Sequence, residues 1–70
     1  MSESVYKIIE LVGSSPTSWE DAAQAAVKSA GMSIRDLRIA EVDTLDMKLD
    51  SGNNIIYRAR VKLSFKIVSD

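Results

Sequence analysis

A chain of 70 residues, with nine Lys and Arg against ten Asp and Glu, has room for one domain, predicted over residues 1–70. Its formal net charge of -1 offers no overall attraction to nucleic acid or to an anionic membrane, so neither partner is expected. The lack of cysteine and histidine excludes disulfides and thiolate metal sites and removes the commonest transition-metal ligand, which leaves association between copies to stabilise so small a core.

The amino terminus shows no targeting signal. It passes from the acidic Glu3 directly into a short alternating run, without the basic start and apolar stretch of a signal peptide. No run of residues reaches the length of a membrane span. We therefore expect a soluble protein of the cytoplasm without a membrane partner.

The first predicted strand extends from Val5 to Val12, where β-branched residues are frequent and partly alternate. The turn formers at positions 13–16 then end it. Thr17 and Glu20 follow with the spacing of a capping box, in which a hydroxyl and a carboxylate satisfy free amides of the first helical turn. This pattern predicts that a helix begins here.

The predicted helix has one apolar face that is almost wholly alanine. The residues of this face follow the three-and-four spacing of a helix: Trp19, Ala22, Ala23, Ala26, Val27 and Ala30. Gly31 stands where a C-terminal cap belongs. Alanine lets a helix approach a sheet closely but buries little area. We therefore expect a short helix in the concave side of a small twisted sheet, with Trp19 as a core anchor.

Two long strand patterns follow, separated by a turn signal at residues 50–54. They are predicted to pair as an antiparallel hairpin. From Ile55 to Val68 one parity is apolar and the other largely basic. From Leu37 to Leu49 the pattern is mixed, because Glu41 and Asp43 interrupt the apolar parity.

These elements predict an α+β subunit of order β-α-β-β, with a three-stranded antiparallel sheet wrapped around one helix. Both later strands exceed the usual length of about five or six residues. A three-stranded sheet also leaves edges that invite further pairing. The long hairpin therefore favours contact between subunits, and a monomer whose hairpin overhangs its core is the alternative.

Catalytic chemistry has few candidate residues in this chain. Without His or Cys, a nucleophile would have to be Ser, Thr or Lys, and no glycine-rich phosphate loop or nucleophile elbow is present. The segment 13–17 precedes a helix amino terminus, but it lacks the lysine and the glycine spacing of a phosphate-binding loop. We therefore predict that the protein is not an enzyme.

Acidic side chains are candidate ligands for a metal ion. They crowd one stretch of strand and turn at Glu41, Asp43, Asp46 and Asp50. Their oxygens suit a hard cation such as calcium or magnesium. On strict alternation Asp46 and Asp50 share one face and the other two acids take the opposite one, so a complete cage would need carbonyls, water or a second subunit. The alternative is that these acids only face Arg58 and its basic neighbours across the hairpin.

Several segments together carry a family resemblance. They are Val5-Tyr6-Lys7, Glu10 to Ser15, the small-residue helix, Leu37 with Ala40-Glu41-Val42, and Tyr57 ahead of the strand that reaches Phe65. In this order and spacing they resemble the dodecin family, and residues 13–20 with Asp46-Met47 are similar to its branch of calcium dodecins. The resemblance implies a β-α-β-β subunit in a hollow homododecamer of twelve copies.

Flavin-binding dodecins stack paired flavin rings between Trp residues of the second strand, and a Gln of the third strand bonds the ring. In an ungapped alignment these positions are Ile39 and Arg58, which supply neither an aromatic plane nor an acceptor. The neighbouring pocket positions are Arg38, Thr44 and Lys48. These five residues mark a degenerate cofactor pocket, and we expect tight flavin binding to be lost.

The calcium-dodecin resemblance also implies a metal site. The carboxylates in matching places are Glu20, Asp36, Asp46 and Asp50. The leading hypothesis is a non-enzymatic homododecameric shell that binds or sequesters small ligands or ions, with calcium as the candidate ion and storage as the role. The alternative is a binder of a flavin or of an anionic nucleotide or coenzyme at subunit interfaces, held by Arg38, Lys48 and Arg58. These cations could instead only pair with acids between subunits.

Overall fold

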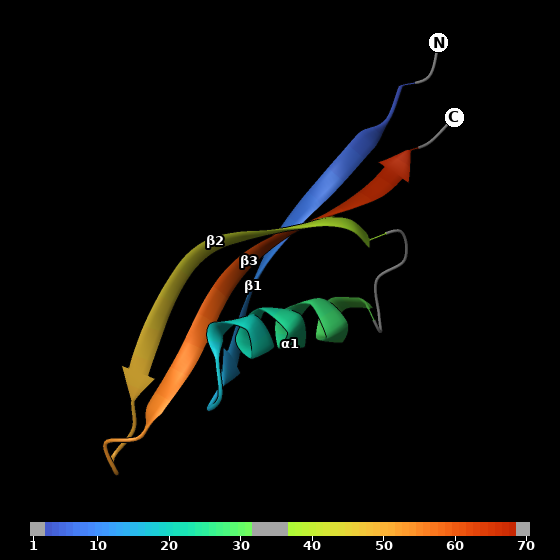
Figure 1. The fold of residues 1–70 in the computed structure, drawn as a ribbon. Coiled ribbons are helices and arrows are strands. Elements are labelled where there is room, and N and C mark those ends of the chain that lie inside the picture. Colours follow the sequence, from blue (N-terminus) through green and yellow to red (C-terminus); the bar gives the residue numbers. More distant parts are fainter. Residues whose placement is uncertain (1–2, 32–36, 69–70) are drawn as a thin grey trace.

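The computed structural model describes residues 3–31 and 37–68. Its elements are β1 (Val5–Ser15), α1 (Trp19–Gly31), β2 (Leu37–Leu49) and β3 (Ile55–Val68). The strands form one antiparallel sheet of order β1-β3-β2, and α1 lies in its concave side (Figure 1). The predicted α+β fold, with its β2–β3 hairpin and a sheet wrapped around one helix, is confirmed.

The core forms between β3 and α1. The alternation of β3 turns its small and branched apolar residues toward the helix, and the alanine face of α1 meets them. The buried hydrophobic residues of the described chain are Ala22, Ala26, Ala30, Ala59, Val61 and Leu63. Because the intervening β3 residues point away from α1, the basic side chains lie on the opposite side of the sheet, which we call the outer face.

β1 continues beyond the predicted end at Val12, because positions 13–15 still pair with β3. Gly13 makes this possible. A Cβ at this position would collide with the carbonyl oxygen of Ala22 and would lie 3.1 Å from the Cβ of Ala26. The glycine therefore permits a close approach of helix to strand and does not form a turn.

The helix start is capped one residue beyond the predicted position. The Oγ of Ser18 accepts a hydrogen bond from the N–H of Asp21 at 3.0 Å. Thr17 instead donates its own N–H to the Oγ of Ser15, also at 3.0 Å. The predicted pairing of Thr17 with Glu20 was therefore wrong by one residue, because the Ser-x-x-Asp pattern fits the same cap.

β2 departs from simple alternation at Arg38 and at Asp43, where its register against β3 shifts. Each shift inserts one residue and exchanges the faces of those that follow. Val42 thereby pairs on the helix side, whereas Glu41 and Asp46 both lie on the outer face, opposite β3 positions 62 and 58. The expectation that Glu41 and Asp46 face opposite sides was wrong, because alternation ignores bulges.

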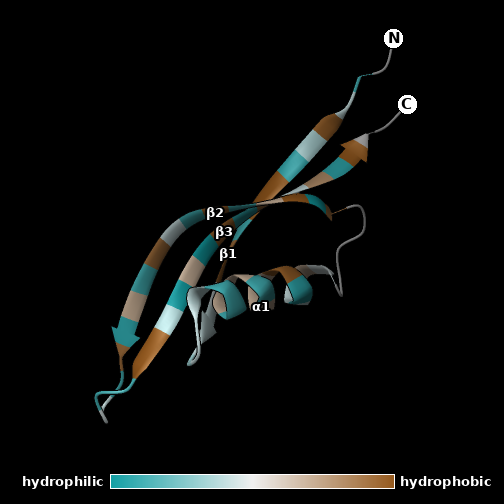
Figure 2. Cartoon of the chain, viewed as in Figure 1, coloured by the Kyte–Doolittle hydropathy of each residue, from teal (hydrophilic) through white to brown (hydrophobic). Residues whose placement is uncertain are grey.

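The molecule is long and thin. Its extents are 55 × 20 × 15 Å and its radius of gyration is 14.5 Å, against about 11 Å for a compact domain of this length. The start of β1 and the end of β3 extend beyond α1 as a two-stranded ribbon (Figure 1). Figure 2 shows hydrophobic bands along this ribbon.

The helix is short as well as alanine-rich. α1 has 13 residues and packs mainly on β1 and β3, so the helix side of β2 is left largely uncovered. Within residues 3–31 and 37–68, no helix has the length and apolar character needed to cross a bilayer.

Candidate functional site

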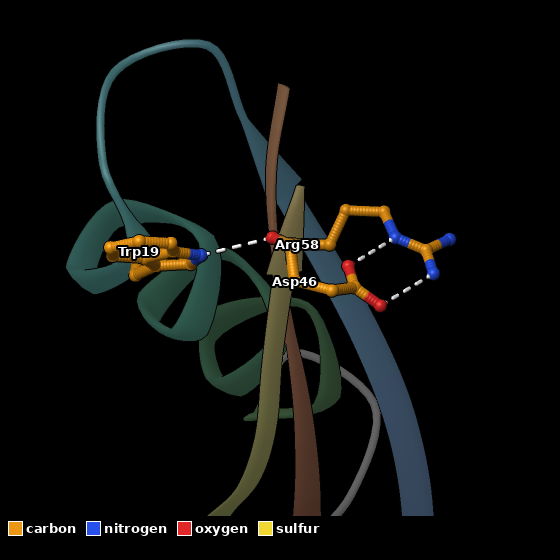
Figure 3. A network of polar contacts seen from close by, with 3 residues as sticks. All are labelled: Trp19, Asp46 and Arg58. Carbon is orange, nitrogen blue, oxygen red and sulfur yellow. Dashed lines mark hydrogen bonds and ion pairs between the residues drawn. The ribbon is translucent and has the colours of Figure 1, made fainter. Parts of the chain in front are cut away.

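The outer face carries a two-point ion pair between β2 and β3. Asp46 and Arg58 are cross-strand partners, and this register brings their side chains together. The Nε of Arg58 donates to Oδ1 of Asp46 at 2.7 Å, and its Nη2 donates to Oδ2 at 2.9 Å (Figure 3). The hydrogen bond and charge of Arg58 lower the pKa of the Asp46 carboxyl below its ordinary value. Both carboxylate oxygens are therefore engaged.

Asp46 also connects the sheet to the start of the helix. Its main-chain carbonyl accepts a hydrogen bond from the indole Nε1 of Trp19 at 3.0 Å. The Trp19 ring in turn meets Tyr57 edge-on, with 5.1 Å between ring centroids and 73° between planes. Figure 3 shows Trp19 and Arg58 on opposite sides of β2. The main chain of Asp46 thus lies between the helix-side aromatic pair and the outer-face ion pair.

Asp50 is held by its own turn. Its Oδ1 accepts hydrogen bonds from the main-chain N–H groups of Gly52 at 2.9 Å and Asn54 at 3.0 Å. The side-chain amide of Asn54 reaches Oδ2 at 3.4 Å. These hydrogen bonds lower the pKa of the Asp50 carboxyl, and the bond from the main-chain N–H of Asn54 has the largest effect. Asn53 completes the turn with a φ of 61°, a left-handed conformation that Asn tolerates.

The three predicted metal ligands that the structure describes do not form one cluster. Asp36 lies outside the described residues, Glu20 is exposed at the start of α1, and Asp46 and Asp50 already hold the partners given above. In the part of the chain that the structure describes, no three acidic side chains gather closely enough to hold a metal. The carboxylate and carbonyl oxygens suit calcium in chemistry, but the described residues of one copy do not bring enough carboxylates together for a calcium site.

The five degenerate pocket positions are spread along the outer side of the hairpin. Lys48 and Arg58 line one hollow of about 380 Å³, together with Val12, Ser14, Asp50 and Ile56. Ile39 and Thr44 pair on the same face nearer the start of β2, and Arg38 occupies the first bulge. The structure therefore brings two of the predicted cations together, and the loss of flavin binding stays a prediction.

Two features of the site were missed by sequence reasoning. On the outer face, Nη1 of Arg60 donates to Oε1 of Glu10 at 3.2 Å and so ties β3 to β1. On the helix side, an apolar hollow of about 360 Å³ opens between α1 and β2, lined by Trp19, Glu20, Ala23, Val42 and Leu45. The pairing of β1 with β3 could have indicated the contact between Arg60 and Glu10. The apolar hollow depends on the bulges of β2.

Comparisons with known proteins agree with the geometry. Residues 5–68 match the Dodecin family model. The calcium dodecin of Mycobacterium tuberculosis is 50% identical over 64 residues, which cover 91% of this chain and 90% of the relative. A crystal structure of a calcium dodecin from the same organism, described as calcium chelating with a novel calcium-binding site, matches with a TM-score of 0.84 and 48% identity over 91% of each chain.

A solved structure with lower sequence identity shares the same fold. The dodecin of Streptomyces coelicolor has a TM-score of 0.86 at 28% identity, over the whole of both chains. The β-α-β-β architecture is thus common to relatives that differ in most of their residues.

Proposed function

The chain belongs to the dodecin family, and from this premise we propose that it is a non-enzymatic, homo-oligomeric shell subunit that binds calcium in a storage or buffering role in the cytoplasm. The observation that carries the calcium assignment is the 50% identity to a calcium dodecin across nearly the whole chain. The oxygen donors on the β2–β3 hairpin are of the type that calcium prefers.

The exposed apolar surface of β2 supports assembly with further copies. Four of its helix-side residues are between 48% and 66% exposed in a single chain, namely Val42, Leu45, Met47 and Leu49. Large apolar patches of this kind mark interaction surfaces in soluble proteins. A copy of the same chain would bury this surface and shorten the free edge of the sheet. Twelve copies is the number that the family resemblance implies.

Because the Asp46 carboxylate lies on the outer face, a copy that contacts this face would complete the metal site. We assign Asp46 as the principal ligand, with Asp50, Glu20 and Asp36 as further candidates. Within residues 3–31 and 37–68, one copy brings no three acidic side chains together, whereas calcium takes roughly six to eight oxygen ligands. Donors from a neighbouring copy would add oxygen ligands, so calcium binding and assembly are expected to favour each other.

Calorimetry and native mass spectrometry on the assembled, chelator-stripped protein test this function. We expect heat on calcium addition, a higher melting temperature in calcium, and one mass that reports copies and bound ions together. Asp46→Asn should lose most of the heat, whereas Asp43→Asn, an equal change of charge in the same strand, should keep it. Absence of heat and of any calcium-dependent melting in the wild type would refute the calcium assignment.

A second candidate function is supported by the hollow that Lys48 and Arg58 line. Two cations and the hydroxyl of Ser14 suit an anionic ligand such as a nucleotide or coenzyme phosphate. Phosphorus or ultraviolet absorbance that copurifies with the protein would favour this function. Riboflavin should bind weakly, because Ile39 provides no stacking plane.

A further inference from the structure

We propose that Arg58 controls the access of a divalent cation to Asp46 by competing with the cation for both carboxylate oxygens. This inference rests on the proposed calcium function and adds to it a residue that sets the affinity. The guanidinium donates from Nε and Nη2 to the two different oxygens, at 2.7 and 2.9 Å. This bidentate geometry occupies the front of the carboxylate, where a cation would approach.

A cation cannot simply be added to this arrangement. Calcium held by both oxygens of one carboxylate, at roughly 2.3–2.6 Å, would use the lone pairs that the two N–H groups now occupy. The guanidinium also stays positively charged at any physiological pH, so it repels a divalent cation held at the same group. Binding of the ion through both oxygens of Asp46 therefore requires Arg58 to turn away.

The environment of the pair allows this movement. In a single chain the Arg58 side chain is 38% exposed and that of Asp46 is 47% exposed, on the face of the sheet that α1 does not cover. Exposed ion pairs of this kind contribute little net stability, so the closed state is easily opened. The hollow beside Arg58, which Ser14 also lines, gives the side chain space. Arg58 is thus a reversible competitor that weakens calcium binding without preventing it.

Asp50, on the same hairpin, has no such movable partner on its Oδ1. The Oδ1 of Asp50 is bound by main-chain N–H groups of Gly52 and Asn54, which cannot turn away unless the turn itself changes. Arg60 provides a matched comparison for Arg58. It lies on the same strand and outer face, but it meets Glu10 through one 3.2 Å contact and does not bond Asp46.

Calcium titration of chelator-stripped, assembled Arg58→Gln and Arg60→Gln proteins tests the inference. Arg58→Gln removes the charge and the bidentate contact, and we expect it to tighten calcium binding by about three- to tenfold. Arg60→Gln should change the affinity by no more than about twofold, because it frees no oxygen of Asp46 and its charge acts on that carboxyl more weakly than the charge of Arg58. The emission of Trp19 gives a second readout, since its indole bonds the carbonyl of Asp46.

The outcomes separate this inference from the function on which it rests. Unchanged or weaker binding by Arg58→Gln, beside a wild type that binds calcium, would overturn the role of Arg58 and leave the calcium function standing. Binding by Arg58→Gln alone would uphold the competition but refute calcium binding by the wild type. Binding by neither protein would overturn both.

A second variant keeps the test valid if Arg58→Gln fails to assemble. Arg58→Lys retains the positive charge but cannot form the two-point contact. We expect it to assemble and to bind calcium about two- to threefold more tightly than wild type, as removal of the bidentate contact alone would predict. Unchanged affinity in an assembled Arg58→Lys protein would count against competition at Asp46.

Discussion

Two aspartates on one hairpin acquire different roles from their hydrogen-bond partners. Asp46 is bonded by the side chain of Arg58, which can rotate into solvent. Asp50 is bonded by main-chain amides at positions 52 and 54, which form part of the turn. Both carboxyls have a lowered pKa. Only the Asp46 carboxyl can exchange its partner for an ion while the backbone stays in place. At the residue scale, the nature of the donor decides the role of each acid.

Acid should weaken the fold partly through Asp50. The pKa of Asp50 is lower in the folded chain than in the unfolded chain. Its contribution to the free energy of unfolding is therefore fully present above the pKa of the unfolded chain, and it is lost as the pH falls through the pKa of the folded chain. Melting temperatures recorded between about pH 7 and pH 2 should therefore drop below about pH 4. Asp50→Asn should melt lower than wild type at neutral pH and show a smaller acid-dependent drop. An equal drop in both proteins would show that Asp50 does not contribute.

At the scale of the elements, the fold depends on how closely α1 approaches β1. The alanine face brings the helix backbone near the sheet, and Gly13 removes the Cβ that would meet Ala22 and Ala26. The core is therefore thin, and its packing requires small residues where the helix and the strand approach each other.

Gly13→Ala should reveal this dependence. The added methyl group would collide with main-chain atoms of α1, and overpacking of this kind costs about 1–3 kcal/mol in the free energy of unfolding. Gly31→Ala is the matched control, since a Cβ there meets none of the described residues within 4 Å and alanine favours a helix. Chemical denaturation of the two variants should show a loss for Gly13→Ala and no loss for Gly31→Ala. Equal stability of both variants would contradict the close-approach account.

At the scale of the whole molecule, the single chain is too extended to cover its own apolar surface. The helix spans β1 and β3 but leaves most of β2 and the projecting ribbon uncovered (Figure 1). The exposed apolar residues include Ile8 on β1 and Ile67 on β3, at 60% and 55%. A long, thin subunit with apolar surface at its centre and end is suited to a closed assembly, where each copy covers its neighbours.

Leu45→Asp tests whether the helix side of β2 is an interface. In a single chain Leu45 is 48% exposed, so an acidic side chain there should be tolerated by the fold. Against a second copy it would place an unpaired charge in an apolar contact, which is strongly unfavourable. Native mass spectrometry should show smaller species for Leu45→Asp. Gln24→Glu, which adds the same charge on an exposed position of α1, should keep the wild-type mass. An unchanged oligomer in both would exclude this surface.

The candidate site was only partly predictable from the sequence. Residue type alone marked Asp46 and Asp50 as oxygen donors and Lys48 and Arg58 as cations of one region. The partner of Asp46 and the capture of Asp50 by its turn depend on side-chain geometry that residue types do not specify. The helix cap shows the same limit on a smaller scale, because two overlapping capping patterns begin at Thr17 and Ser18 and only one forms.

The sequence by itself determined the order of elements, the buried parity of β3 and the alanine face of α1, because these follow from local periodicity along one strand or helix. Only the tertiary structure decided the rest. The bulges at Arg38 and Asp43 arise from pairing with β3, and the second of them places Glu41 and Asp46 on the same outer face. In the sequence Gly13 resembles a turn former, whereas in the structure it gives α1 room to approach β1. Contacts between segments distant in sequence decide such features, and no local pattern encodes them.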